Sequence, residues 1–145
     1  MIDRGDLGRP GAANGTAEHW LAERINDDPA ILGLGGLDVA RVSWRLGQVS
    51  LLMRSEAGSA LYIVELQLGP TDDRHLIRVV ERWAVERKRH STSRCFAVLG
   101  AEQFPHRCLN VLQLIHTAIP LRAMKLHIAE TVRDAALRFT PVVLG

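Results

Sequence analysis

The sequence predicts an α/β fold, with a mixed central sheet flanked by helices and an antiparallel pair of strands near its start. Two strand patterns, at residues 49–53 and 62–68, lie close together and are joined by a short polar segment. Two helical patterns then alternate with short apolar runs, which is typical of strands joined by crossover helices. The 145 residues are enough for one sizeable core, so we expect a single domain over 16–145 after a Gly-rich, flexible tail over 1–15.

The two adjacent strand patterns form a hairpin whose register follows from their apolar residues. Residues two apart in a strand share a face, so the even-numbered apolar residues of 62–68 oppose Glu65 and Gln67. A four-residue loop at 56–59 places Ser50 across from Glu65 and Gln48 across from Gln67. A slip of one residue would mix the faces, which favours this register over its neighbours.

The remaining elements before this hairpin are a helix and a strand. Thr16 is a suitable N-cap for a helix over 17–26, which Asp28-Pro29 ends. Its apolar stripe includes Trp20, Leu21 and Ile25, and Glu18 lies elsewhere on the helix as a first-turn acid. Residues 31–38 are apolar and Gly-rich and predict no regular path, and a first strand is expected over 39–46.

After the hairpin, Thr71 or Asp72 caps a long helix that runs to about His90. Its buried stripe includes Leu76, Val79 and Trp83. A strand over 95–99, a helix over 105–117 and two strands over 124–128 and 137–143 complete the chain. If the strands on either side of the long helix are parallel neighbours, the crossover is expected to be right-handed.

Composition excludes several classes of protein. The formal net charge of +2 is too small to indicate nucleic-acid binding without regard to how the charges are distributed. No apolar run reaches the roughly 18 residues of a membrane span, so we expect a cytoplasmic protein with no membrane partner. Cys95 and Cys108 are expected to be buried thiols, and the six histidines show no spacing typical of zinc.

Several segments together resemble a bacterial branch of the PD-(D/E)XK, or restriction-endonuclease-like, nuclease superfamily. The segments are Glu65-Leu-Gln-Leu-Gly69, Thr71-Asp72, His75-Leu-Ile-Arg78, Glu86-Arg-Lys-Arg89, Leu109-Asn-Val111 and Ile119-Pro-Leu121. The similarity extends over most of the chain from Glu18 onward. It implies a restriction-endonuclease-like core of a helix, three antiparallel strands and a helix–strand crossover.

The resemblance also implies a site, in which an Asp on the second strand and Glu-x-Lys on the third hold Mg²⁺. Here the catalytic positions are occupied by Ser50, Glu65 and Gln67, and Glu65 with Glu18 would be the metal ligands. Ser50 offers a neutral hydroxyl where an anionic ligand is expected, and Gln67 lacks the positive charge of the usual Lys. Apart from the resemblance, the sequence favours reading Glu65 as a solvated or Arg-paired carboxylate.

Basic residues of the long helix form the candidate nucleic-acid-binding set. Three of them recur every four residues and share a helix face, and three more lie at the helix end. Such a face would contact phosphates without reading base sequence. It would otherwise be a solvated surface partly neutralised by acids of the same helix. The set is Arg74, Arg78, Arg82, Arg87, Lys88 and Arg89.

These observations lead to three hypotheses. The first is a nuclease-fold protein with a degenerate metal site that binds DNA or RNA, with weak or no cleavage. The second is an active Mg²⁺-dependent endonuclease that uses Glu18, Glu65 and Gln67. The third is a protein-interaction module that uses the fold as a scaffold. All three are compatible with a monomer or a homodimer.

Overall fold

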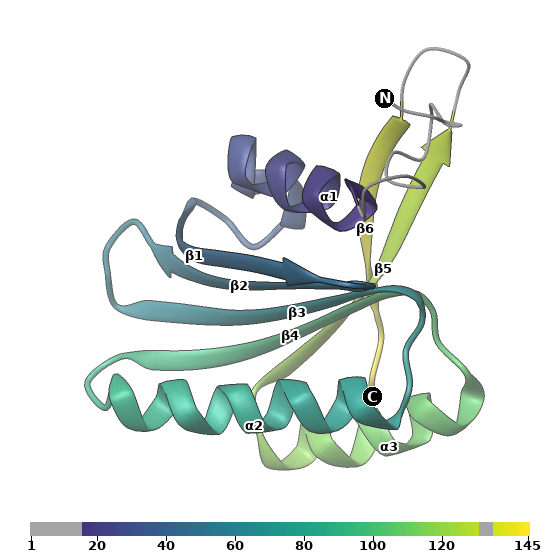
Figure 1. The fold of residues 1–145 in the computed structure, drawn as a ribbon. Coiled ribbons are helices and arrows are strands. Elements are labelled where there is room, and N and C mark those ends of the chain that lie inside the picture. The colour runs from purple at the N-terminus through teal and green to yellow at the C-terminus, as the bar shows by residue number, and fades with distance from the viewer. Residues whose placement is uncertain (1–15, 131–134) are drawn as a thin grey trace.

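A six-stranded mixed sheet forms the centre of the protein, with the strands side by side in chain order, β1 to β6 (Figure 1). The computed structural model describes residues 16–130 and 135–145. The predicted tail over 1–15 lies outside the described residues. The elements are α1 (Thr16–Asp27), η1 (Pro29–Leu32), β1 (Leu37–Arg45), β2 (Gln48–Ser55), β3 (Ala60–Pro70), α2 (Asp73–Arg89), β4 (Arg94–Gln103), α3 (His106–Ala118), β5 (Leu121–Glu130) and β6 (Ala135–Val142).

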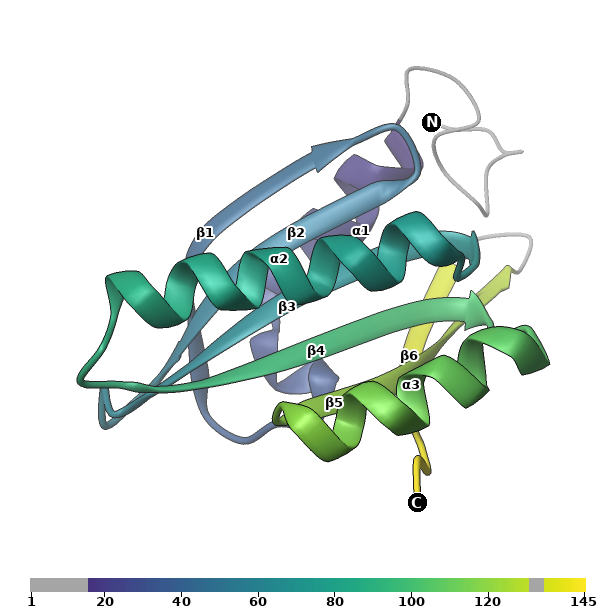
Figure 2. The same cartoon turned by 90° about the horizontal axis from the view of Figure 1, so that it is seen from below.

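The helices form a layer on each face of the sheet. Helix α1 lies on one face, against β1 and β2, and α2 and α3 lie on the other (Figure 1). Seen from the α2 and α3 side, α2 lies along the middle strands and β1 extends beyond it at the sheet edge (Figure 2). Helix α2 therefore covers the middle strands but leaves the edge strand β1 uncovered on this face.

The strand directions confirm the predicted mixed sheet. β1, β2 and β3 pair antiparallel, β3, β4 and β5 pair parallel, and β5 and β6 pair antiparallel. The hairpin register is also confirmed, since Ser50 pairs with Glu65 and Gln48 with Gln67. Helix α2 connects the parallel strands β3 and β4, as the sequence pattern predicted.

Among the described residues, three apolar clusters hold the layers together, and the two larger ones lie on opposite faces of the sheet. Leu21 and Ile25 of α1 pack on the alternate β3 residues Tyr62, Val64 and Leu66. On the opposite face, a second core joins α2, α3 and strands β4 and β5, through Leu76, Val79, Leu99, Leu112 and Leu121. Strands β3 and β4 contribute buried residues to both faces, as expected for central parallel strands.

Several boundaries differ from those predicted. Strands β4 and β5 each extend over 10 residues, longer than their predicted apolar runs, because both also include polar residues such as Arg94, Glu102 and Arg122. The segment with no predicted path, residues 31–38, begins within the short helix η1, whose C-cap is Gly33 with a φ of 72°. Both cysteines are free and buried. No helix among the described residues is long and apolar enough to cross a membrane.

Candidate functional site

Glu65 lies at the middle of β3 and faces α2, where its side chain is completely buried. Its Oε1 accepts a hydrogen bond from Ser50 Oγ at 2.8 Å and one from Arg78 Nε at 3.2 Å. Its Oε2 lies 2.6 Å from Arg82 Nε. Oε1 thus accepts two hydrogen bonds, whereas Oε2 contacts Arg82 as an ion pair and accepts no hydrogen bond from the described residues. We call Ser50, Glu65, Arg78 and Arg82 the Glu65 cluster.

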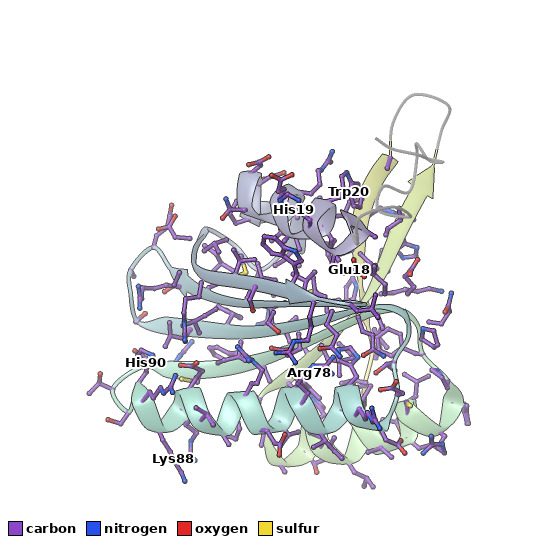
Figure 3. The ribbon with its side chains drawn as sticks, viewed as in Figure 1. Glu18, His19, Trp20, Arg78, Lys88 and His90 are labelled. Atoms are coloured by element: carbon purple, nitrogen blue, oxygen red, sulfur yellow. The ribbon has the colours of Figure 1, made fainter. Side chains whose placement is uncertain are left out.

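The local sequence explains why these four side chains meet. The hairpin register sets Ser50 beside Glu65 on the same face of neighbouring strands. Arg78 and Arg82 are four residues apart on α2, so they project from one side of the helix toward the sheet. Figure 3 shows Arg78 between α2 and the sheet. The cluster thus joins β2, β3 and α2.

Burial and charge act in opposite directions on Glu65. Loss of hydration raises the pKa of this carboxyl, because burial disfavours the charged form. The Ser50 hydrogen bond and the positive charges of Arg82 and Arg78 lower it, and the effect of burial is the larger. The arginines therefore offset only part of the cost of holding a carboxylate between two layers of the protein.

Gln67 is connected to the cluster through Arg78. Its Oε1 accepts a hydrogen bond from an Arg78 terminal nitrogen at 3.1 Å, and its Nε2 donates to the carbonyl of Pro70 at 2.8 Å. The structure thus brings together the three residues that the sequence singled out as catalytic, Ser50, Glu65 and Gln67. Ser50 contacts Glu65 directly, and Arg78 links Glu65 to Gln67.

Glu18 is not part of this arrangement. It lies on α1, across the sheet from Arg78 (Figure 3), and it is buried rather than exposed on the helix surface. Its Oε2 accepts a 2.6 Å hydrogen bond from the backbone N–H of Gly47, in the turn between β1 and β2. Gly47 has a φ of 75°, which is favourable for glycine. Glu18 therefore fixes α1 to the β1–β2 turn.

The donors at the cluster do not match the coordination that Mg²⁺ prefers. They are one carboxylate, one hydroxyl and one amide oxygen, and the carboxylate and amide oxygens already accept bonds from arginine. Two guanidinium charges at the carboxylate oppose a divalent cation. Over the described ranges 16–130 and 135–145, no group of three or more His, Cys, Asp or Glu residues is arranged to hold a metal.

A second buried acid lies farther along α2. Glu86 Oε2 is 2.6 Å from a terminal nitrogen of Arg41, on the edge strand β1, and 3.6 Å from one of Arg89. Its Oε1 lies 3.4 Å from His90 Nε2. A hollow of about 250 Å³ opens beside these groups and is also lined by Arg82.

Arginines from β1 and α2 together form a basic surface along the uncovered edge of the sheet. Pairing of Ser43 with Ser50 places Ser43, Arg41 and Arg45 on the side of β1 that faces α2, and all three are exposed. Side chains of Arg82 and Arg89 are 43% and 60% exposed even though both contact buried acids. We call Arg41, Arg45, Arg78, Arg82 and Arg89 the β1–α2 basic surface.

The predicted basic set therefore separates into two groups. Arg78, Arg82 and Arg89 belong to the β1–α2 basic surface. Arg87 and Lys88 line a different hollow, at the end of α2. The remaining member, Arg74, is exposed in the first turns of the helix.

Comparison with solved structures gives three matches of similar quality. EndoMS in its apo form matches with a TM-score of 0.59 and 16% identity over 74% of this chain. An EndoMS–dsDNA complex matches with a TM-score of 0.57 and 15% identity over 74% of this chain. A repair endonuclease from Pyrococcus abyssi matches with a TM-score of 0.59 and 14% identity over 76% of this chain. This chain has an endonuclease fold.

The comparisons are limited to the fold. The aligned part covers 46%, 44% and 46% of the three matched chains, so this chain spans less than half of their length. No protein-family model matches the sequence, and no curated protein matches it. At these identities the likeness gives the layout of strands and helices, and function must be argued from the site.

Arg41 and Arg45 were not singled out from the sequence, and His75 appeared there only as part of a segment that carries the resemblance. Arg41 and Arg45 alternate with Ser43 on the predicted first strand, a polar pattern that could have placed them on one face. His75 is completely buried, and its Nε2 lies 3.0 Å from the Glu65 carbonyl oxygen, while Thr71 Oγ1 lies 2.8 Å from its Nδ1. No local sequence signal distinguishes it from the other histidines.

The two contacts of His75 define its protonation. A carbonyl oxygen can only accept, so Nε2 carries the proton and Nδ1 accepts from the Thr71 hydroxyl. Burial lowers the pKa of His75 to about 4, because an imidazolium would lose its hydration there. His75 is therefore neutral at neutral pH, and it connects the β3–α2 turn to the backbone at Glu65.

Proposed function

We propose that this protein binds DNA through the β1–α2 basic surface and that its altered nuclease site cleaves weakly or not at all. The observation that carries the proposal is that Ser50 and Arg78 donate hydrogen bonds to one Glu65 oxygen while Arg82 forms an ion pair with the other. A carboxylate held in this way is a structural ion-pair acceptor. It is not free to coordinate a catalytic metal.

We also propose membership of the PD-(D/E)XK superfamily. Glu65 and Gln67 occupy the third strand of an antiparallel unit, next to Ser50 on the second strand, and α2 leads from there to a parallel strand. This is the arrangement that the resemblance implied. The endonuclease fold of the three matched structures supports it.

The nature of the ligand follows from the exposed guanidinium groups. Arginine forms bidentate, charge-assisted hydrogen bonds to phosphate, and several arginines along one sheet edge suit a repeating phosphate backbone. One matched structure is a complex of EndoMS with double-stranded DNA, which favours DNA over RNA as the first ligand to test. Glu86 and Glu65 reduce the net charge of this surface without covering it.

Binding is tested by fluorescence anisotropy with a labelled DNA duplex over a range of salt concentrations. The Arg41→Ala/Arg45→Ala variant is expected to bind about tenfold or more weakly and to lower the slope of log K against log salt by roughly two. Arg138→Ala, an exposed arginine on β6, is the matched control. Binding that is absent, or insensitive to salt, would reject the proposal in favour of a protein-interaction module.

Cleavage is tested by incubating single- and double-stranded DNA and RNA with the protein in Mg²⁺ or Mn²⁺. We expect little or no product. Efficient cleavage by the wild-type protein that disappears in Glu65→Ala would instead establish an active metal-dependent endonuclease. Cleavage that persists in Glu65→Ala would indicate a contaminating nuclease.

A further inference from the structure

A second basic hollow lies where α2 and α3 end and β4 begins, separate from the β1–α2 basic surface. Its volume is about 870 Å³. The charged residues that line it are all cationic, namely Arg87, Lys88 and Arg94, and Ser91 and Ser93 add two hydroxyl groups. Within the described part of the chain, no carboxylate lines this hollow. A space of this size is within the range of small-ligand sites and exceeds what a single ion needs.

Aromatic side chains hold two of these cations without neutralising them. The Arg87 guanidinium carbon lies 5.4 Å from the centroid of the Trp83 ring, and that of Arg94 lies 5.3 Å from the Phe96 ring. Trp83 is fixed in turn, because its Nε1 donates a 2.8 Å hydrogen bond to the carbonyl of Cys95. Cation–π contact orients a guanidinium and leaves its N–H groups available to an anion.

The negative ends of two helix dipoles offset only part of the positive charge of the hollow. Helices α2 and α3 both end at the hollow, and each C-terminus carries roughly half a negative charge. Together they offset about one of the three cations, which leaves about two positive charges. Arg94 belongs to a strand, so it does not complement a helix end of its own. None of the three cations forms an ion pair with a described carboxylate.

We propose that this hollow is a phosphate-binding site and that the phosphates of a nucleic-acid strand occupy it. This inference rests on the proposed function, which supplies the nucleic acid. The distance from the hollow to the Glu65 cluster can be counted along β4. Arg94 lies at the hollow, and Leu99, five residues later, pairs with Glu65, which gives a separation of roughly 17 Å. One phosphate therefore cannot contact both places, and the hollow would hold a second segment of the bound strand.

The indole N–H of Trp83 provides a site-specific readout of this hollow by NMR. Titration with inorganic pyrophosphate and with a 5′-phosphorylated oligonucleotide is expected to shift the Trp83 signal in the wild-type protein. Arg87→Ala and Arg94→Ala are each expected to weaken oligonucleotide binding about fivefold to tenfold and to lower the salt slope by about one. Arg87→Lys and Arg94→Lys keep the charge and should retain most of the affinity, which separates loss of binding from loss of folding.

The variants distinguish failure of this inference from failure of the proposed function. Oligonucleotide binding that is lost in Arg41→Ala/Arg45→Ala but unchanged in Arg87→Ala/Arg94→Ala would overturn the second site and leave the proposed function intact. If the wild-type protein binds no oligonucleotide while pyrophosphate still shifts Trp83, the occupant is a free phosphate compound and the inference is overturned together with the proposed function. Equal losses in Arg138→Ala would show that the charge of the whole protein, and not the hollow, sets the affinity.

Discussion

Glu65 is buried between the sheet and α2, where an unpaired carboxylate would be strongly disfavoured. The protein compensates with one hydroxyl donor and two guanidinium groups, at distances between 2.6 and 3.2 Å. Arg82 remains 43% exposed, so part of its interaction with Glu65 is screened by water. Removing the acid would leave Arg78, which is only 20% exposed, without its main partner.

Glu65→Gln is therefore expected to destabilise the fold by about 1–3 kcal/mol, since a neutral amide leaves both arginines poorly compensated. Urea denaturation followed by circular dichroism measures this difference. Glu81→Gln, at an exposed position on α2, is the control and should change stability by less than about 0.5 kcal/mol. Equal stability of Glu65→Gln and the wild type would show that the ion pairs contribute nothing.

His75 makes stability depend on pH in a defined direction. Its pKa is about 4 in the folded protein, against an ordinary value of 6.5 for an exposed histidine, so the unfolded chain binds the proton first as pH falls. The contribution of neutral His75 is complete above pH 6.5 and is lost progressively toward pH 4. The difference of about 2.5 in pKa corresponds to roughly 3 kcal/mol at most.

We expect His75→Gln to remove this loss of stability between pH 6.5 and 4, even though the variant is less stable at neutral pH. Urea midpoints of both proteins across this pH range provide the measurement. The raised pKa of Glu65 acts in the opposite direction, because it favours the fold at low pH, and it is common to both proteins. If the urea midpoints of the wild type and the variant fall in parallel as the pH is lowered, the result would contradict a buried neutral His75.

At the scale of elements, α2 carries most of the candidate site and depends on its N-terminal cap. Asp72 Oδ1 accepts a 2.9 Å hydrogen bond from the backbone N–H of His75, and the pKa of Asp72 is lowered mainly by this bond. The cap sets the start of the helix and thereby the rotation that points Arg78 and Arg82 toward Glu65. Asp73, the next residue, pairs instead with the exposed Arg107.

Asp72→Ala is expected to lower the free energy of unfolding by about 1 kcal/mol, the usual contribution of an N-cap. Asp73→Ala is the neighbouring control and should cost only a few tenths, because both members of its ion pair are more than half exposed. Thermal unfolding followed by circular dichroism compares the two variants. A larger loss for Asp73→Ala than for Asp72→Ala would show that the cap is placed incorrectly.

The contact of α1 with the β1–β2 turn gives Glu18 a structural role that can be separated from a catalytic one. Glu18→Ala leaves the Gly47 N–H without its buried acceptor, so we expect a loss of about 1–2 kcal/mol. DNA affinity, measured by anisotropy at a temperature where the variant is folded, should stay within about twofold of the wild type, because Glu18 lies across the sheet from Arg78. A metal-dependent activity that vanished in Glu18→Ala without loss of stability would contradict this role.

Over the whole molecule, sequence reasoning located the elements more reliably than the partners of the charged residues. The pairing of Ser50 with Glu65 followed from a two-residue apolar period, which permits one register. The pairing of Arg78 and Arg82 with Glu65 depends on how a helix is placed over a sheet, and acids nearer in sequence were equally plausible partners. The contact of Glu18 with Gly47 was not predicted, because Gly47 is 29 residues away in a turn.

The proposed membership of the PD-(D/E)XK superfamily implies a metal site on strands β2 and β3. The side chains that meet there under α2 are one carboxylate, one neutral hydroxyl and two guanidinium groups. Mg²⁺ sites commonly use one or two carboxylates with several waters. Charge, and not backbone geometry, is therefore the main departure.

This distinction predicts that three substitutions together create a metal site. Ser50→Asp adds a second carboxylate beside Glu65, while Arg78→Met and Arg82→Met remove the opposing charges and keep long apolar stems for packing. We expect this triple variant to bind Mn²⁺ at least about tenfold more tightly than the wild type, as measured by electron paramagnetic resonance of the free ion, since the two carboxylates are then uncompensated. The Arg78→Met/Arg82→Met variant, with Ser50 unchanged, isolates the effect of the second acid. Wild-type protein that binds Mn²⁺ as tightly as the triple variant would contradict the structural role of the arginines, because the ion would then displace them from Glu65 without assistance.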